Sequence, residues 1–550
     1  MYLSRSKFKT KSGKIYSSVI LRHSYREGKK TKKKTIANLS KCSKEEILAI
    51  ELALKHKHDL TNIGSFSKSV KLKEGLSFGA CWTILETAKK LNITSALGNS
   101  HESKLALWQI ISRVLDQGSR LSSVRLGETH ALSSILNLEK GFTEDNLYKN
   151  LKWLAKNQPE IETKLFKKRN KKSTNIFLYD VTSSYLEGTE NALADWGYNR
   201  DGKKGKKQIV IGLLCDENGI PLSTQVFKGN TNDTSTFASQ IIKVKNRFNC
   251  KKVIFVGDRG MIKSGQIENL ETHGFNYITA ITKKQIETLL KKDIIQYKLF
   301  DEKVNEVEEQ GIRYILRRNP IRASEMSQTR NAKKESIERL VEDRNLYLQN
   351  HPRAKINVAK TLVTNKIKRL NIFSWLSVKA VDKKLILTID KKKLEEASML
   401  DGCYVIKTDI QKKDLESKNI HNRYKDLAFV ESAFRTCKTN LEVRPIYVRS
   451  EQSTYGHVFV VMMSYMIMKE LDKCWENLYL TVEEGLKSLS TLCLTEVFVN
   501  ENQSFQCVPN PRVQNKKMLD ALDFKLPKFL QKNNVKVVTK VSRRKSAQNN

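Results

Sequence analysis

The sequence contains no segment that would anchor the chain in a membrane. No run in its 550 residues approaches the roughly 18 consecutive apolar residues that a membrane-spanning helix needs. The first residues, Met1-Tyr-Leu-Ser-Arg-Ser-Lys, lack the apolar core of a signal peptide. We therefore expect a cytoplasmic protein that has no membrane partner.

The sequence also lacks the cysteine pairs that bind zinc. Its nine cysteines are scattered, and no two of them have the spacing Cys-x-x-Cys. This pattern argues against a zinc ribbon and against a disulfide framework. We expect the thiols to be buried instead.

Acidic residues are few in comparison with basic ones. The chain has 99 lysines and arginines against 59 aspartates and glutamates, so its formal net charge is +40. A surplus of this size favours a polyanionic partner. DNA, ribosomal RNA and an anionic membrane surface all satisfy that description, so the charge alone does not choose among them.

Two of the aspartates stand where an apolar run meets polar residues. Asn175-Ile-Phe-Leu-Tyr leads to Asp180, and Val253-Ile-Phe-Val-Gly leads to Asp258. Each run predicts a buried strand that delivers an acid at its polar end. Glycines near the second acid allow the backbone or a ligand to come close.

A third acid, Glu431, belongs to a predicted helix. The stretch from Tyr424 to Lys438 contains neither glycine nor proline, and positions 424, 427, 431, 434 and 438 fall on one helical face. Tyr424, Glu431 and Lys438 should therefore line up along one side of this helix.

These three acids suggest a metal centre. Hard divalent cations prefer oxygen ligands, and a two-metal site needs a few carboxylates that hold the ions roughly 4 Å apart across a phosphodiester. A single acid at a strand end is usually a turn former or a helix cap. The order strand-aspartate, strand-aspartate, helix-glutamate with basic neighbours is far rarer, and it predicts metal-dependent cleavage of DNA.

These residues resemble the DDE transposases of bacterial insertion sequences, and among them the family-four branch. The signature of that branch is Tyr-x2-Arg-x3-Glu-x6-Lys, and the chain has the same spacing with leucine in place of arginine: Tyr424, Leu427, Glu431 and Lys438. The resemblance covers roughly residues 170 to 470. Its further motifs are Asp180-Val-Thr182, Gly197-Tyr-Asn-Arg-Asp-Gly-Lys, Phe227-Lys-Gly-Asn-Thr-Asn-Asp233, Gly257-Asp-Arg-Gly-Met261, Arg444-Pro445 and Gly456-His457.

The resemblance implies an α/β protein with a ribonuclease-H-like catalytic core. It implies that Asp180, Asp258 and Glu431 are the catalytic residues and that they hold two Mg²⁺ ions, for which Mn²⁺ can substitute. One ion would activate water or a 3′-hydroxyl while the other stabilises the leaving oxygen. Leu427 removes one phosphate contact that the family's arginine would make.

The same resemblance implies that the substrate is double-stranded DNA. The enzyme would cleave terminal inverted repeats and join their 3′-hydroxyls to target DNA, as a homodimer in a synaptic complex at the nucleoid. Tyr424, Lys438 and Arg259 would contact DNA phosphates, and Thr182 would support the loop of Asp180. A purely structural role fits Arg259 and Thr182 equally well.

We place the catalytic core at residues 173–284 and 419–510. Apolar runs at 208–215 and 221–227 meet across a short turn with a glycine, which predicts an antiparallel hairpin. A helix over about 234–247 should then lead back to the strand before the second aspartate.

The long segment between Asp258 and Glu431 predicts a strand-rich insertion at 285–418. A long charged helix, expected over about 324–348, separates its strand candidates. In similar enzymes an aromatic residue of the insertion stacks on a flipped base, and Trp375 is the tryptophan that the insertion offers. A role in the core or in an interface is the alternative for this residue.

Outside the core we expect further basic parts. Residues 1–42 alternate basic and β-branched residues, which is typical of a small β module. Residues 43–168 look helical, and they are expected to bind the transposon ends or to form a supporting subdomain. The basic run 167–172 reads as a linker that can touch phosphates, and the lysine-rich tail 511–550 should fray or lie along DNA.

An apolar stretch follows the Gly456-His457 motif. Residues 458–468 are too few and too polar for a membrane span, so we expect a buried helix that packs behind Glu431. His457 stands alone, and a structural hydrogen bond suits it better than a catalytic role.

Other functions stay open at this point. One is a catalytically silent DNA-binding protein derived from a transposase, which Leu427 favours. Another is a basic RNA-binding or structural protein in which the three acids are accidental. A nearer alternative is a ribonuclease-H-fold nuclease without strand transfer. Metal-dependent nicking, and the joining of 3′ ends to target DNA, distinguish these functions.

Overall fold

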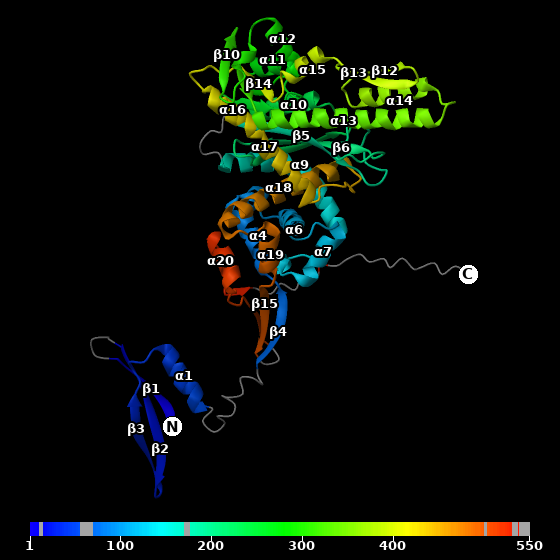
Figure 1. Cartoon of the computed structure of the whole chain (residues 1–550). Helices are drawn as coiled ribbons and strands as arrows, with labels where there is room; N and C mark the ends of the chain where they lie inside the picture. The colour runs from blue at the N-terminus through cyan, green and yellow to red at the C-terminus, as the bar shows by residue number, and fades with distance from the viewer. Residues whose placement is uncertain (10–14, 56–69, 170–175, 500–502, 531–536, 538–550) are drawn as a thin grey trace.

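The computed structural model describes residues 1–9, 15–55, 70–169, 176–499, 503–530 and 537. Its largest sheet is a mixed sheet of eight strands, in the upper part of the view in Figure 1. In the order in which they pair, the strands are β10 (Asn305–Glu309), β11 (Ile312–Arg318), β14 (Cys403–Thr408), β9 (Asn276–Ala280), β8 (Ile254–Gly257), β5 (Ile176–Tyr185), β6 (Gln208–Cys215) and β7 (Pro221–Lys228). β5, β6 and β7 are antiparallel, whereas β5, β8 and β9 run parallel.

Helices cover both faces of this sheet, which explains why its central strands are apolar on both sides. α10 packs on the face that carries Tyr179, and α16, α17 and α18 pack on the face that carries Leu178. Because side chains alternate along a strand, Asp180 belongs to the second face. The bounds of these helices are α10 Asp233–Ile242, α16 Ser417–Lys425, α17 Leu427–Thr439 and α18 Glu451–Trp475.

The local predictions for the first half of the core are confirmed. β6 and β7 form the antiparallel hairpin predicted over 208–227, with all of β6 buried. The helix predicted over 234–247 is α10, which continues as one turn of π-helix, η1 (Lys243–Arg247). This helix returns the chain to β8 and so brings the two aspartate-bearing strands together.

The insertion at 285–418 differs from the expected strand-rich unit. Its strands β10, β11 and β14 extend the central sheet beyond β9, so this half belongs to the same sheet as the core. The predicted charged helix is confirmed as α13 (Pro320–Asn350), and Asn319 caps it by accepting a hydrogen bond from the N–H of Arg322. With α14 (Ile356–Arg369), β12 (Leu376–Val381) and β13 (Lys384–Ile389), α13 projects to one side around a small core of its own (Figure 1).

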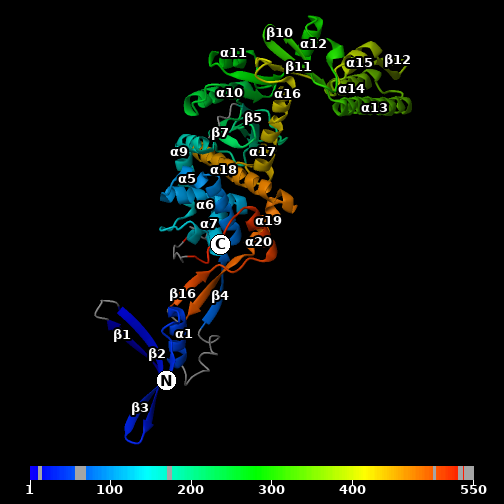
Figure 2. The same ribbon diagram turned by 90° about the vertical axis from the view of Figure 1, so that its left-hand side faces the viewer.

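A layer of helices supports the face of the sheet that carries α18 (Figure 2). It consists of α4 (Gly79–Lys90), α5 (Ile93–Leu97), α6 (His101–Leu115), α7 (Arg120–Thr129), α8 (Leu132–Ile135) and α9 (Glu144–Arg169). These helices share one continuous apolar core with α18, so the stretch 458–468 is buried in a helix as predicted. Within the described ranges, no helix is long and apolar enough to cross a membrane.

The helical region and the C-terminal tail each contribute unexpected elements. β4 (Val70–Ser77) pairs with β15 (Cys493–Val499), in a sheet completed by β16 (Gln503–Cys507) and β17 (Phe529–Leu530). α20 (Val513–Ala521) buries Met518 and Leu519, so the expectation that the tail frays is wrong for this part of it. The rest of the tail, residues 531–536 and 538–550, lies outside the described residues.

The N-terminal residues form a small antiparallel sheet of three strands, β1 (Tyr2–Lys9), β2 (Ile15–Glu27) and β3 (Lys30–Asn38). α1 (Lys44–Lys55) follows it and starts with a capping box, in which Ser43 and Glu46 exchange hydrogen bonds. In the basic run 167–172, residues 167–169 belong to α9 rather than to a linker, and residues 170–172 lie outside the described ranges.

The nine cysteines are all free thiols. Cys81, Cys215 and Cys437 are buried as expected, whereas the other six are partly exposed. Burial raises the pKa of Cys81 and of Cys437 to about 12, so both thiols keep their protons.

Candidate active site

Asp180 and Asp258 come from neighbouring strands. β5 and β8 pair in parallel with Tyr179 opposite Gly257, so the aspartate is the next residue on each of them. β8 ends just before Asp258, as predicted. β5 does not end at Asp180 but continues to Tyr185, because its second half pairs with β6. Asp180 is therefore held within a strand, and Asp258 begins a loop.

The charges of Asp258 and Glu431 both act on Asp180. The pKa of Asp180 is raised from 3.8 to about 7, first by burial and then by the charges of Asp258 and Glu431. A hydrogen bond of 2.8 Å from the N–H of Val181 and the charge of Arg200 act in the opposite direction. Interactions of this kind act between neighbouring charges, so the two strand-borne aspartates and the helix-borne glutamate belong to one neighbourhood of the fold.

The single helix predicted over 424–438 is interrupted. α16 ends and α17 begins at Asp426, whose φ is −63° and ψ −13°. Tyr424 and Glu431 therefore lie on different helices, yet Tyr424 stays at the site, because its hydroxyl donates to Oδ1 of Asp258 at 3.5 Å. Burial and the charge of Asp258 raise the pKa of Tyr424 far above its ordinary value, so the hydroxyl keeps its proton.

Two positions of the expected signature point inward. Leu427 is 9% exposed and packs in the main core, so it makes no contact with DNA. Lys438 donates to Oδ1 of Asp201 at 2.7 Å, and Arg444 donates to the same oxygen at 2.5 Å. The side chain of Asp201 is 1% exposed, and a buried carboxylate needs such partners. Lys438 is thus engaged with Asp201 in this structure, and its contact with a phosphate stays a prediction.

An ion pair that the sequence reading missed borders the site. Nη2 of Arg200 lies 2.8 Å from both carboxylate oxygens of Asp233. A Cβ added at Gly260 would lie 3.8 Å from Oδ2 of Asp258 and 4.0 Å from Oδ2 of Asp233, so the two aspartates flank that glycine. Both residues belong to motifs visible in the sequence, but no spacing rule pairs them.

Arg259 and Thr182 lie next to the two aspartates. The side chain of Arg259 is exposed, and its backbone N–H donates to Oδ1 of Asp258 at 2.7 Å. Thr182 is buried on the same face of β5 as Asp180. The first residue can meet a ligand, whereas the second belongs to the packing beneath the site.

Trp375 and His457 lie away from the acids. Trp375 is 4% exposed and packs in the small core of the insertion, so the prediction that it stacks on a base is wrong: its ring is covered. Nδ1 of His457 lies 3.0 Å from Nη2 of Arg120 and accepts from it. Burial and Arg120 lower the pKa of His457 well below its ordinary value, which confirms a neutral, structural histidine.

The three carboxylates suit a hard divalent cation by their chemistry. They offer only oxygen donors, the ligands that Mg²⁺ and Mn²⁺ prefer. The pKa of Asp180 is raised first by burial and then by the charges of Asp258 and Glu431, and a bound cation would oppose both effects. Across the described part of the chain, no three His, Cys, Asp or Glu side chains form a ready-made metal site. A cation would therefore have to draw these oxygens together.

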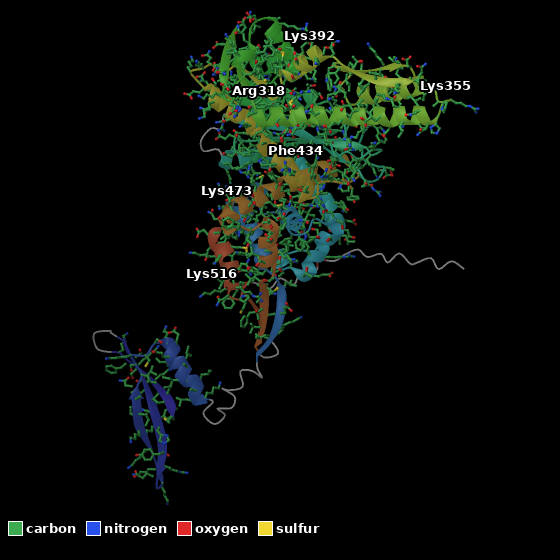
Figure 3. All side chains as sticks on the ribbon, viewed as in Figure 1. Arg318, Lys355, Lys392, Phe434, Lys473 and Lys516 are labelled. Atoms are coloured by element: carbon green, nitrogen blue, oxygen red, sulfur yellow. The ribbon has the colours of Figure 1, made fainter. Side chains whose placement is uncertain are left out.

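Basic side chains lie on more than one part of the molecule. Arg318, Lys355 and Lys392 lie on the insertion, while Lys473 and Lys516 lie on the helical side of the molecule (Figure 3).

Two family models match the chain. The model described as "Transposase DDE domain" matches residues 171–467, and that described as "IS1634 family transposase, N-terminal domain" matches residues 3–68. No curated protein matches significantly.

Three solved structures show weak likeness. The piggyBac transposase synaptic complex with hairpin DNA has 9% identity over 74% of this chain and 75% of that chain, with a TM-score of 0.36. The Mos1 transposase paired-end complex with left transposon end has 16% identity over 33% and 58%, with a TM-score of 0.14. A pre-cleavage Mos1 transpososome has 17% identity over 32% and 58%, and the same TM-score of 0.14.

Proposed function

The chain belongs to the transposase DDE domain family, whose model matches more than half of it, and on this premise we propose that Asp180, Asp258 and Glu431 are its catalytic carboxylates. As a member of this family the chain is a DNA transposase, a metal-dependent enzyme that cuts and transfers DNA. One observation carries the assignment of residues: the charges of Asp258 and Glu431, from a different strand and a helix, both raise the pKa of the buried Asp180.

We further propose that the core has the ribonuclease-H-like fold that the resemblance implied. The strand order β7-β6-β5-β8-β9 supports it, with an antiparallel hairpin on one side of β5 and parallel neighbours on the other. Along the chain, β5 is the first strand of this core and β8 is the fourth, and the two are neighbours in the sheet. Asp180 lies on β5, and Asp258 directly follows β8.

Asp180, Asp258 and Glu431 would hold two Mg²⁺ ions, or Mn²⁺ in their place. Bound ions supply Lewis-acid stabilisation of the phosphate and of the attacking hydroxyl. The hydroxyl of Tyr424 fixes Oδ1 of Asp258, which makes Tyr424 a positioning residue. Burial and the neighbouring carboxylates raise the pKa of Asp180 to about 7, so a bound cation would compete with the proton for this carboxyl.

The proposed substrate is double-stranded DNA that carries the element's terminal inverted repeats, together with a target that receives the 3′-hydroxyls. Two chains would form the synaptic complex, and Arg259, exposed beside Asp258, is assigned to a phosphate. Of the four positions of the family-four signature, we assign Tyr424 and Glu431 to the active site. Leu427 packs in the core and Lys438 pairs with Asp201.

The parts outside the core are proposed to help in binding the transposon ends. The module at 1–42 belongs to the stretch that matches an IS1634-family N-terminal domain, and most of its side chains are exposed. Within 43–168, helices α4 to α9 share a core with α18, which supports a buttressing role for their inner faces and leaves their outer faces for DNA. We propose the insertion at 285–418 and the tail at 511–550 as the remaining two parts of the chain's domain organisation.

A catalytically silent DNA-binding protein is the second candidate. It is favoured by Leu427 and Lys438, since neither offers DNA the contact that the signature predicts. Metal-dependent cleavage decides between the two functions.

The test is cleavage of a plasmid that carries the element's own ends, with Mg²⁺ or Mn²⁺. Asp180→Asn, Asp258→Asn and Glu431→Gln keep the side-chain size and should each abolish cleavage. Asp472→Asn, at an exposed position of α18, is the matched control and should cleave normally. Cleavage retained by any of the three would remove that residue from the site, and DNA binding without cleavage by the wild type would favour the silent protein.

A further inference from the structure

The segment between β5 and β6 exposes two aromatic side chains. Trp196 is 58% exposed and Tyr198 is 81% exposed, with only Gly197 between them. Aromatic rings gain much free energy from burial, so two neighbouring rings left in water call for a partner.

The backbone beneath these rings is firmly held. Asp195 and Gln208 exchange two backbone hydrogen bonds of 3.0 Å, which joins the segment to the start of β6. A Cβ added at Gly197 would collide with the carbonyl oxygen of Gly229, so this glycine is needed for close packing of two backbone segments. The N–H of Trp196 donates to Oδ1 of Asp195 at 2.8 Å. The exposure of the rings is therefore a property of a fixed backbone.

A short chain of contacts links the rings to the catalytic carboxylates. The guanidinium of Arg200 lies 5.8 Å from the ring centre of Tyr198, in cation–π geometry. The same guanidinium binds both oxygens of Asp233 at 2.8 Å, and Asp233 and Asp258 flank Gly260. The backbone N–H of Arg200 also donates to Oγ of Ser183 in β5 at 2.9 Å. Through Arg200, Tyr198 is thus linked to the ion pair that borders Asp258.

The charges around the rings suit a nucleic acid. Residues 200–207 contain five basic residues and one acid, Asp201, which Lys438 and Arg444 neutralise internally. The ammonium of Lys203 lies 5.8 Å from the ring of Tyr185. Aromatic rings interleaved with cations are the usual means of holding unpaired nucleotides, because every base offers a face for stacking.

We propose that Trp196 and Tyr198 form a stacking platform for an unpaired nucleobase next to the phosphate that is cleaved. The inference rests on the proposed function, because it requires DNA at the site of Asp180, Asp258 and Glu431. The platform lies on the catalytic core rather than on the insertion. It would take the base-stacking role that the sequence analysis predicted for Trp375, which is buried.

The test compares the affinity for two forms of one DNA. Fluorescence anisotropy is measured with a single-stranded oligonucleotide of the element's terminal sequence and with its intact duplex, in an Asp258→Asn background that cannot cut. Adding Trp196→Ala and Tyr198→Ala should weaken binding of the single strand by about tenfold or more and leave duplex binding within about twofold. Tyr479→Ala, which removes a ring that is 96% exposed beyond α18, is the control and should change neither affinity.

Conservative variants separate stacking from apolar packing. The double phenylalanine variant, Trp196→Phe with Tyr198→Phe, should keep the affinity for the single strand, because phenylalanine still stacks. The double leucine variant should lose affinity as the alanine variant does. Equal affinity of the alanine variant and its parent for the single strand would overturn the proposal. A change confined to oligomeric state in light scattering would overturn it too and would mark the rings as a protein interface.

The failure of this inference is distinguishable from failure of the proposed function. If triad variants abolish cleavage while the alanine variant binds single strands normally, only the platform is wrong. If the wild type does not cleave but single-strand binding depends on the two rings, the platform stands and the catalytic assignment falls.

Discussion

Replacing Asp180 by asparagine should stabilise the metal-free protein while abolishing cleavage. The folded protein raises the pKa of Asp180 from 3.8 to about 7, chiefly by burial. Between these values the folded state binds a proton that the unfolded state has lost, so the contribution of this group to stability falls as pH rises and is lowest above pH 7. Asparagine has no charge to bury and can still accept the hydrogen bond from Val181.

The magnitude follows from the pKa values. The difference between 3.8 and about 7 corresponds to about 4 kcal/mol, since one pH unit is worth about 1.4 kcal/mol. We take this as the upper limit of the gain at pH 8, and about half of it should remain at pH 5.5. Because 1 kcal/mol shifts Tm by about 2–4 °C in a domain of roughly 200 residues, the gain in Tm at pH 8 should be on the order of 10 °C or less.

The assay is thermal or urea unfolding of the wild type and Asp180→Asn in EDTA, at pH 5.5 and pH 8. Asp520→Asn, at an exposed position of α20, removes the same charge away from the site and is the control. Adding Mg²⁺ at pH 8 should stabilise the wild type, because a cation that binds only the folded state shifts the folding equilibrium towards that state. The difference in stability between the wild type and Asp180→Asn should therefore become smaller. The reasoning would be refuted if Asp180→Asn were no more stable than the wild type at pH 8. It would also be refuted if the difference in stability between the two proteins were the same at pH 5.5 and pH 8.

Three further substitutions test the packing around the site. Lys438→Met should destabilise the protein by about 1–3 kcal/mol in chemical unfolding, because Asp201 stays buried with one cation fewer, and adding Asp201→Asn should recover part of the loss. Gly212→Ala should lower the free energy of unfolding by about 1–3 kcal/mol, because a Cβ would collide with the hydroxyl of Tyr179. Adding Tyr179→Phe should restore most of the lost stability, and a double variant with no gain in stability would contradict the collision. Trp375→Ala should cost about 3–5 kcal/mol and leave cleavage per folded molecule unchanged, so a folded variant that cannot cleave would contradict its assignment to the core.

Local patterns in the sequence predicted the elements that local interactions determine. The apolar run before Asp258 ends where β8 ends, and the glycine-containing turn after β6 returns the chain as β7. The charged stretch of the insertion is one helix because Asn319 and Pro320 start it and no glycine interrupts it. The acids that these elements deliver were therefore identifiable before their meeting point was known.

The failures concern partners that are distant in sequence. Asp180 looked like a strand end because the apolar run stops there, but pairing with β6 carries the strand further. Lys438 looked free for DNA because no local pattern reveals its bond with Asp201. Trp375 and Trp196 cannot be told apart by residue type, since burial of one and exposure of the other arise from tertiary packing.

The central claim is that Asp180, Asp258 and Glu431 form one metal centre. Anomalous diffraction from crystals grown with Mn²⁺ tests it most directly, because it locates the ion without assuming an activity. The account predicts anomalous density bounded by carboxylate oxygens of all three residues, and its loss in Asp258→Asn. Mn²⁺ held elsewhere, or bound without Asp180 and Glu431, would contradict the assignment.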